Sequence, residues 1–356
     1  IASCLVGSEM CIRDRHKGGN VMWKKIVCSV GATTGAAIVG SYLYTKLIEK
    51  RSYKSFLKEK FNHVSRGKQY FIKPKKIDQM LKMAQIENSK PFKATKYRFN
   101  HRVDIREYYG THTYYVNHQN DPHQLKILYM HGGSWVAGPF KEHYQMMDQL
   151  ATDYNAEVIA PIYPKVPQSG KRATFDLMTH IYRNLLDSVS SSDHIIIMGD
   201  SAGGNITLSY AQYLNEINLP QPGHIITISP VVDATFTNPE IPHYEKVDSM
   251  IGKEGLKTFA KIWAESDELD NYKVSPINGD FNNLGHITLS VGTHELLYPD
   301  VIKLSRKLNS EGISHNLLIG SHMLHDYAIQ NIPEAKQFRE NSVSYTHLTL
   351  PTNREV

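Results

Sequence analysis

Ser201 lies in a short segment that is suited to holding a nucleophile. Residues 195–205 read IIIMGDSAGGN, so an apolar run ends in glycines on both sides of one serine. Between a strand and a helix, a Gly-x-Ser-x-Gly segment makes a sharp turn that exposes the serine hydroxyl, and Gly199 and Gly203 must be small for it to close. A serine that merely caps a helix is the alternative reading. The pattern favours Ser201 as the nucleophile of an acyl transfer.

Acyl transfer also needs hydrogen-bond donors for the oxyanion that forms when the nucleophile attacks. The segment His131-Gly-Gly-Ser134 ends another apolar run, and its glycines let the backbone approach a substrate closely. The expected donors are the backbone N–H groups of Gly132, Gly133 and Ala202. We expect His131 to brace this loop rather than transfer protons, and Ser134 and Asp200 to support the site. A tight strand-to-loop turn without a catalytic role is the alternative.

A serine nucleophile needs a base and an acid that orients the base. Glu295 directly follows an apolar run in GTHE and is the expected acid, whereas Asp300 is its rival and more plausibly caps the next helix. His325, in the segment after the last apolar run, is the expected base. The rival histidines are His322, His315 and His294. The chain order serine, acid, histidine is that of α/β hydrolases and differs from the trypsin and subtilisin orders.

These segments must be positioned by a sheet whose strands end at one edge. The sequence predicts two antiparallel strands within 98–118 and then strands at 125–133, 156–164, 194–199, 224–230, 286–292 and 315–320. Helical spacing at 173–187 lies between two of them. Strands that alternate with helices predict a mostly parallel sheet covered by helices on both faces, with ligand sites beyond the carboxyl ends of the strands. The interval 231–278 is expected to form a cap.

The joint pattern HGGSW, GDSAGGN, GTHELLYPD and MLHDY resembles the hormone-sensitive-lipase-like family of α/β-hydrolase esterases, over residues 125–327. The tripeptide 162–164 and Asp176 are also similar to a segment of that family. Two positions depart from it: Ser134 stands where a third glycine is common, and Glu295 where aspartate is common. The resemblance implies an α/β-hydrolase fold with a helical cap.

The resemblance also implies a serine carboxylic-ester hydrolase that acts on short acyl esters through an acyl-enzyme on Ser201. It implies a small-molecule ester as the substrate, with no cofactor and no metal. Two other functions stay open: an amidase or deacetylase on an acetylated or formylated small molecule, and a non-catalytic, membrane-tethered binding module. The second is disfavoured because both the serine and the histidine are present.

The two ends of the chain are expected to be foreign to the protein. Residues 1–21 and 342–356 resemble translated adapter or upstream sequence, and such segments are left out of fold reasoning. The expected hydrolase domain is 51–341, with cap elements at about 51–95 and 231–278.

Residues 22–50 are expected to form a membrane anchor or a signal segment. The stretch from Ile26 to Thr45 has no charged residue, and twenty helical residues span a bilayer core. The chain is therefore expected to be membrane-associated or exported. Lys-rich flanks on both sides leave the orientation open, including a cytoplasmic catalytic body.

Composition restricts the partners. The chain has 40 basic and 35 acidic residues and a net charge of +5, without a dense Lys/Arg tract of the kind that binds phosphates, so no nucleic-acid partner is expected. Three cysteines, of which two lie in the first 21 residues, exclude a disulfide framework. The sequence leaves the oligomeric state open.

Overall fold

The computed structural model describes residues 37–349, and the chain divides into two units, residues 1–53 and 54–356. In the first unit, residues 37–47 are helical. Within 37–349, we find no helix with the length and apolar character that a membrane crossing requires. Residues 1–21 and most of the stretch from Ile26 to Thr45 lie outside the described range, so the foreign N-terminus and the anchor stay predictions.

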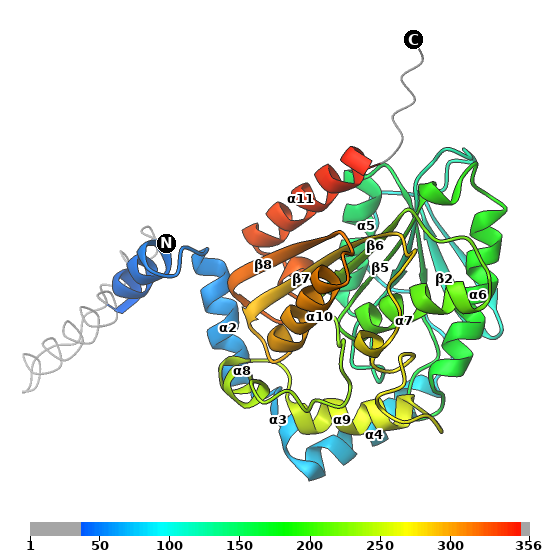
Figure 1. The fold of residues 1–356 in the computed structure, drawn as a ribbon. Helices are drawn as coiled ribbons and strands as arrows, with labels where there is room; N and C mark the ends of the chain where they lie inside the picture. Colours follow the sequence, from blue (N-terminus) through cyan, green and yellow to red (C-terminus); the bar gives the residue numbers. More distant parts are fainter. Residues whose placement is uncertain (1–36, 350–356) are drawn as a thin grey trace, which may run out of the picture. The chain divides into compact units, whose positions relative to one another are not determined.

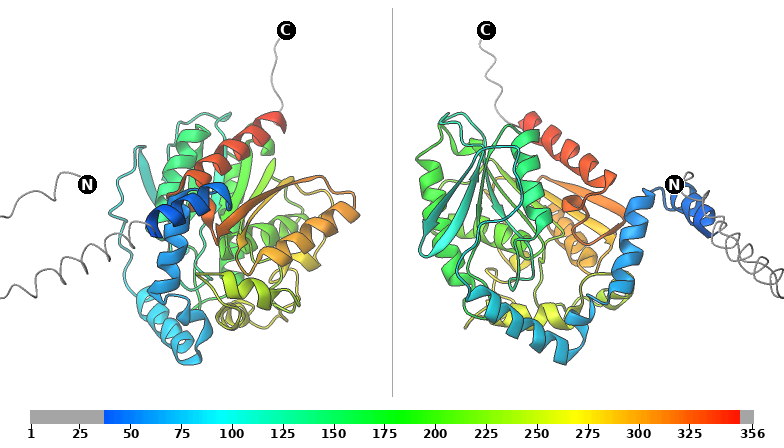
Figure 2. Two further views of the ribbon diagram at one scale, coloured as in Figure 1. Left: turned by 90° about the vertical axis from the view of Figure 1, so that its left-hand side faces the viewer. Right: turned by 180° about the vertical axis from the view of Figure 1, so that it is seen from behind.

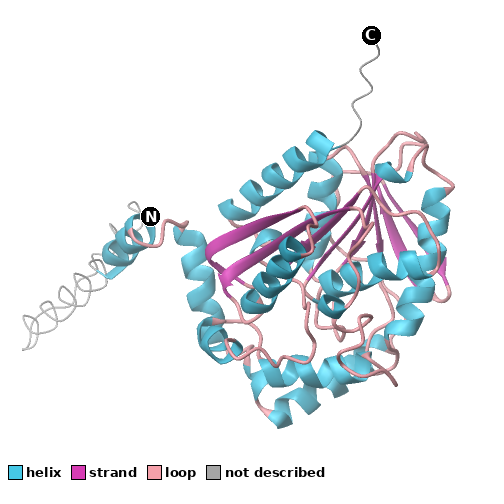
Figure 3. Cartoon of the chain, viewed as in Figure 1, coloured by secondary structure: helices cyan, strands magenta, loops and turns pink. Residues whose placement is uncertain are grey.

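The second unit is built on one eight-stranded sheet with the order β1-β2-β4-β3-β5-β6-β7-β8 (Figures 1 and 3). The strands are β1 (Val103–Tyr108), β2 (Thr111–Val116), β3 (Lys126–Met130), β4 (Glu157–Pro161), β5 (Ile195–Asp200), β6 (His224–Ile228), β7 (His286–His294) and β8 (His315–Leu324). The β1–β2 and β2–β4 pairs are antiparallel and every other pair is parallel. This confirms the predicted α/β class and its mostly parallel sheet.

Helices cover both faces of this sheet (Figure 3). The α-helices of this unit are α2 (Tyr53–Ser65), α3 (Gln69–Ile72), α4 (Pro74–Asn88), α5 (Lys141–Asp153), α6 (Lys171–Leu186), α7 (Ala202–Glu216), α8 (Ile241–Val247), α9 (Lys253–Trp263), α10 (Tyr298–Ser310) and α11 (Pro333–Thr349). Helices α6, α7 and α10 lie on one face of the sheet, and α5 and α11 lie on the other. Short 3₁₀ turns occupy Ser192–His194, Pro276–Asn278 and Tyr327–Ile329. Helices α3 and α9 of the cap pack together, with the rings of Phe71 and Phe259 5.9 Å apart.

The apolar residues that begin strand β5 show why this sheet needs two helical layers. Successive strand side chains point to opposite faces. Ile195 and Ile197 pack in the cluster that includes side chains of α6, α7 and α10, whereas Ile196 and Met198 pack in the cluster that includes α5 and α11. All four residues are buried. A strand buried on both faces reads as a continuous apolar run, which is what the sequence shows.

Two elements extend further than the sequence suggested. Strand β8 continues to Leu324, because a register shift between Gly292 and His294 lets His294 pair with Leu324. His325 therefore directly follows a strand rather than lying within a long loop. Helix α11 runs to Thr349 and so enters the segment 342–356, whose foreign origin stays a prediction.

Candidate active site

Ser201 occupies the turn between β5 and α7 with unusual backbone angles, φ 52° and ψ −118°. Such angles are strained for a residue with a Cβ, and the surrounding structure must hold them. The Ser201 N–H donates to the Ile228 carbonyl at 2.8 Å, and the Ser201 carbonyl accepts from the Asn205 N–H at 3.1 Å. A Cβ on Gly203 would collide with the Met130 carbonyl, so the turn closes only around glycine there. The Ser201 hydroxyl is thereby held beyond the carboxyl edge of the sheet.

A chain of hydrogen bonds joins the three candidate catalytic side chains. The Ser201 hydroxyl lies 2.9 Å from His325 Nε2, and His325 Nδ1–H donates to Glu295 Oε2 at 2.5 Å. The other Glu295 oxygen accepts from the Gly292 N–H at 2.6 Å and from the Ser229 hydroxyl at 2.8 Å. These three side chains are at most 3% exposed. Glu295 thus fixes the ring of His325 with Nδ1 protonated and Nε2 directed at the serine.

The rival residues lie elsewhere. Asp300 sits in the first turn of α10 and accepts from the Asn238 side-chain amide at 2.8 Å. His322 lies within β8, and its ring is 5.1 Å from that of His294, which contacts Glu59. His315 contacts the Ser305 hydroxyl at 2.7 Å. The structure therefore brings Glu295 and His325, and not these rivals, to Ser201.

We expect Asp300→Asn to stabilise the protein near neutral pH while leaving ester hydrolysis nearly unchanged. Burial raises the pKa of Asp300 to about 6, and within residues 37–349 its Oδ2 atom has no hydrogen-bond partner. As pH rises, the carboxyl of Asp300 ionises in the unfolded chain before it ionises in the folded protein, so wild-type stability should fall by about 3 kcal/mol in total between about pH 3 and about pH 7. Asparagine can still accept from Asn238 and does not ionise. Urea unfolding across this pH range measures the effect.

Asp78→Asn is the matched control, because Asp78 is exposed on α4. Its stability profile should follow that of the wild type. If Asp300→Asn instead abolished hydrolysis and kept the wild-type pH dependence of stability, Asp300 would have to be reconsidered as the orienting acid.

Asp200 fastens the His131–Ser134 loop to the strand that carries the nucleophile. Its Oδ1 accepts from the Tyr129 hydroxyl at 2.5 Å, and its Oδ2 accepts from the Gly132 N–H at 2.9 Å and contacts His143 Nε2 at 3.1 Å. His143 Nδ1 accepts from the Phe140 N–H, so the proton of a neutral His143 lies on Nε2 and points at Asp200. The Gly132 N–H therefore already has a hydrogen-bond acceptor within the protein. Among residues 37–349, the N–H groups of Gly133 and Ala202 have no such partner.

His131 is placed as a brace. Its Nδ1–H donates to the Gly132 carbonyl at 2.7 Å, and its ring stacks on Tyr163 with centroids 4.4 Å apart. The Tyr163 hydroxyl donates to the His131 carbonyl at 3.0 Å. Burial, aided by the Lys165 ammonium, lowers the pKa of His131 well below its usual value, so this ring is neutral. A neutral buried ring packed on tyrosine suits a structural role.

A cavity of about 370 Å³ opens onto Ser201 and His325. Phe71 of α3, Met80 of α4 and Phe140 form apolar parts of its wall, and Gly133 and Ser134 also line it. Ser134 has φ 56° and its side chain is 4% exposed. Ser134 therefore narrows the cavity at the place where a third glycine would leave it open.

Asp326 was not among the residues predicted from the sequence, although it lies beside the candidate base. Asp326 Oδ2 is 3.2 Å from His325 Nε2, the same nitrogen that faces Ser201, and the Asp326 N–H donates to the Ser229 hydroxyl at 3.2 Å. Burial alone would lower the pKa of His325, but the carboxylates of Asp326 and Glu295 outweigh burial and raise it. Burial also raises the pKa of Asp326 well above its usual value. Asp326 therefore influences when His325 becomes a neutral base.

We expect Asp326→Asn to move the acidic limb of the kcat/KM profile to lower pH by about one unit or more. Only neutral His325 can accept the serine proton, and this limb reports its pKa in the free enzyme. The Asp326 carboxylate stabilises the protonated imidazolium form of His325, so its removal destabilises that form and lowers the pKa of the ring. Hydrolysis of a p-nitrophenyl ester between pH 4 and 10 measures the shift. Asp280→Asn, an exposed aspartate, should leave the limb in place, and an unmoved limb in Asp326→Asn would contradict this role.

A second buried carboxylate, Asp248, joins the cap to the turn that holds Glu295. It accepts from the N–H groups of Met250 and Ile251 at 2.7 and 2.9 Å and from that of Leu296 at 3.0 Å. Met250 and Ile251 line the cavity, and Leu296 follows Glu295. Asp248 thus couples the cavity wall to the candidate acid. The sequence carried no signal for it, since the contact spans 48 residues.

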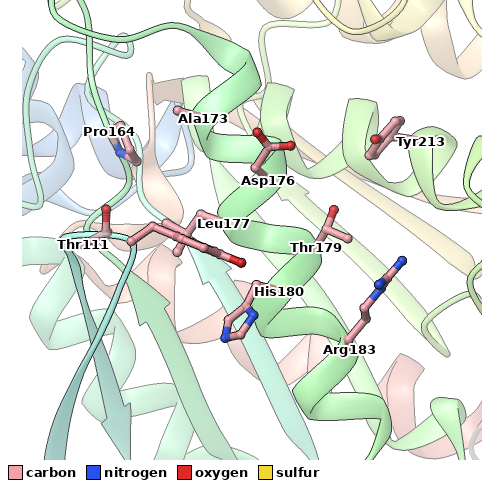
Figure 4. A pocket seen from close by; sticks show the side chains of 10 residues that line it. Thr111, Pro164, Ala173, Asp176, Leu177, Thr179, His180, Arg183 and Tyr213 are labelled. Atoms are coloured by element: carbon pink, nitrogen blue, oxygen red, sulfur yellow. The ribbon is translucent and has the colours of Figure 1, made fainter.

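A separate cavity of about 540 Å³ lies over α6 (Figure 4). Asp176, Thr179 and Arg183 come from that helix, and Tyr213 of α7 stands opposite them. None of the candidate catalytic residues lines it. Asp176, noted in the sequence for its similarity to a family segment, therefore lies apart from Ser201.

An eight-stranded, mostly parallel sheet whose central strand runs into a Gly-x-Ser-x-Gly turn defines an α/β hydrolase. In agreement, residues 127–329 match the alpha/beta hydrolase fold family. The chain belongs to this family. It is a carboxylic ester hydrolase.

Individual relatives are distant. The chain is 28% identical to an esterase of Acinetobacter venetianus over 214 residues, which cover 59% of this chain and 71% of that one. It is 26% identical to an acetyl-hydrolase of Streptomyces hygroscopicus over 180 residues, which cover 51% and 60% of the two chains. The structure of a hormone-sensitive lipase from a metagenome library shares the fold, with a TM-score of 0.69 and 23% identity over 83% of this chain and 98% of that one.

Proposed function

We propose that the chain hydrolyses esters of short acyl chains through an acyl-enzyme on Ser201. The observation that carries the proposal is the hydrogen-bonded chain Ser201–His325–Glu295, with distances of 2.9 and 2.5 Å, at the wall of the 370 Å³ cavity. A nucleophile, a base and an orienting acid in this order are what acyl transfer requires.

In the first half-reaction, His325 Nε2 takes the proton of Ser201 as Oγ forms a bond to the ester carbonyl carbon. The tetrahedral oxyanion accepts hydrogen bonds from the N–H groups of Gly133 and Ala202. Each such donor contributes roughly 10²–10³ in rate. We assign Gly132 a positioning role instead of the donor role expected from the sequence, because its N–H already donates to Asp200.

Collapse of this intermediate breaks the bond to the alcohol oxygen, which takes the proton from His325 Nε2, and the acyl group stays on Ser201. Water then gives a proton to the same nitrogen and attacks the acyl carbon, and collapse returns that proton to Ser201 as the acid leaves. Glu295 stays ionised throughout and holds the protonated ring.

The size of the cavity and the acetyl-hydrolase relative support a short acyl chain. The large side chains of Phe71, Met80 and Phe140 border the cavity and limit its reach. Ser134 takes further space beside the nucleophile.

Trapping of the intermediate tests the mechanism and the chain length together. Protein mixed with p-nitrophenyl acetate and quenched in acid should carry one acetyl group on the peptide that contains Ser201. Turnover should fall steadily as the acyl chain lengthens from two to twelve carbons. An acyl group on another residue would refute the mechanism, and faster turnover of the matching anilide than of the ester would favour the amidase alternative.

A further inference from the structure

Exposed apolar side chains gather on one part of the second unit. Of the ten large apolar side chains that are exposed within the described part of this unit, seven lie on α2–α4 or at the loop before α5. We call these seven residues the apolar rim: Leu57, Phe61, Val64, Ile72, Met83, Ile86 and Phe140. Large exposed apolar patches mark places where a protein meets a partner or a membrane. The left panel of Figure 2 shows α2, α3 and α4 (blue to cyan) along one side of this unit.

Helix α2 presents its apolar stripe outward. Leu57, Phe61 and Val64 follow helical spacing, lie on one face and are 49, 70 and 78% exposed. On another face, Ser55 and Glu59 are buried, and Glu59 Oε1 contacts His294 Nδ1 at 3.1 Å. A helix at the surface of a globular protein normally shows the opposite pattern, with its apolar stripe toward the core. The reversal indicates that a partner covers this stripe.

The apolar rim borders the entrance to the candidate active site. Lys58 and Asn62, the neighbours of Leu57 and Phe61, line the cavity that contains Ser201. Phe140 lines the same cavity and also a second one of about 830 Å³, to which Met83 and Ile86 contribute. A partner bound to the rim would therefore lie beside the path of the substrate.

The positive charge around the rim favours an anionic membrane as the partner over a second copy of the chain. Helices α2–α4 and their short connections contain nine basic and three acidic residues, an excess larger than the net charge of +5 of the whole chain. Lys54, Lys60, Lys73, Lys75 and Lys82 are exposed there. Exposed apolar side chains mixed with lysines are typical of helices that lie in the interface of an anionic membrane. A second copy of the chain would bring like charges together, which opposes self-association.

The first unit, described by itself, also exposes large apolar side chains. Between residues 37 and 48, seven large apolar side chains are exposed: Ile38, Val39, Tyr42, Leu43, Tyr44, Leu47 and Ile48. This unit ends at Tyr53, the first residue of α2.

We propose that the apolar rim docks onto an anionic lipid surface, with the entrance to the Ser201 cavity facing that surface. The lipid contact follows from the rim and its charge, whereas the further step, that the ester reaches Ser201 from the lipid phase, rests on the function proposed above. Leu57, Phe61 and Val64 insert at the level of the headgroups, and the lysines contact lipid phosphates.

Site-directed fluorescence quenching tests the docking in the full chain. The Ser201→Ala variant prevents turnover, and serine replaces Cys4, Cys11 and Cys28 so that one introduced cysteine carries a bimane label. The label is placed in the rim by Phe61→Cys or Met83→Cys. Matched controls are Ile105→Cys and Ile319→Cys, whose native side chains are 38 and 46% exposed and lie outside the rim. Vesicles of phosphatidylcholine and phosphatidylglycerol are prepared with and without bromine on the acyl chains.

Brominated vesicles should remove most of the fluorescence of the two rim labels and leave that of the two control labels. High salt or vesicles of phosphatidylcholine alone should weaken this quenching, because the lysines then contribute less. Unquenched rim labels would overturn the proposal, whether the chain stays in solution or is attached to the vesicles by another segment. If the fluorescence of the rim labels changed with protein concentration and not with lipid, the proposal would also be overturned. The rim would then bind a second copy of the chain. Because the labelled variant has no nucleophile, the result is independent of the proposed hydrolysis.

Discussion

Replacing Ser201 with alanine should lower kcat/KM for p-nitrophenyl acetate by about 10⁴–10⁶-fold. The change removes the only atom that our mechanism joins to the acyl group, and what remains is the weak catalysis by oxyanion donors and substrate binding. The loss should appear in kcat, because the cavity walls that bind the ester are unchanged. Initial rates with the purified full chain measure it.

The stability of this variant separates a chemical effect from a structural one. Alanine at φ 52° is strained as serine is, and its methyl group fits where the Cβ of Ser201 already lies. The melting temperature should therefore stay close to that of the wild type. Ser310→Ala, at an exposed serine that ends α10, is the matched control and should keep full activity. Activity of the Ser201 variant within about tenfold of wild type would leave the acyl-enzyme mechanism without support.

The fold could be predicted from the sequence because its strongest signals are local. A run of apolar residues such as Ile195–Met198 is suited to a strand buried on both faces, and the glycines after it allow a tight turn. The serine turn, the mostly parallel sheet and the early antiparallel hairpin follow from such patterns and general rules of chain connection. The end of β8 could not be predicted, because a register shift against β7 extends the strand.

The pairing of the candidate residues depends on contacts that sequence spacing does not show. Glu295 and Asp300 are both acids near the end of β7, and only the fold places one beside His325 and the other beside Asn238. The Gly132 amide looked free in the sequence, but Asp200, 68 residues away, accepts its hydrogen bond. Ser229 lay unnoticed for the same reason, since its contact with Glu295 spans 66 residues.

Replacing Glu295 with glutamine should lower kcat by about 10⁴-fold although the side chain keeps its shape. In the native site one Glu295 oxygen accepts from the Gly292 N–H and the Ser229 hydroxyl. A glutamine must place its carbonyl oxygen there, because its NH₂ group cannot accept these bonds. The NH₂ group then faces His325 Nδ1 and donates to it. The neutral ring is thereby driven to carry its proton on Nε2, the atom that must receive the serine proton.

This argument distinguishes a wrong tautomer from a loss of the fold. The wild type and the Glu295→Gln variant should unfold at similar urea concentrations near neutral pH, because two of the three hydrogen bonds to this side chain are kept and the third is reversed in direction. Glu311→Gln, an exposed glutamate after α10, should leave kcat unchanged. If Glu295→Gln retained kcat within about tenfold, the Glu295 carboxylate would have no part in orienting His325. Asp326, 3.2 Å from the same ring, would then be the remaining carboxylate that acts on His325.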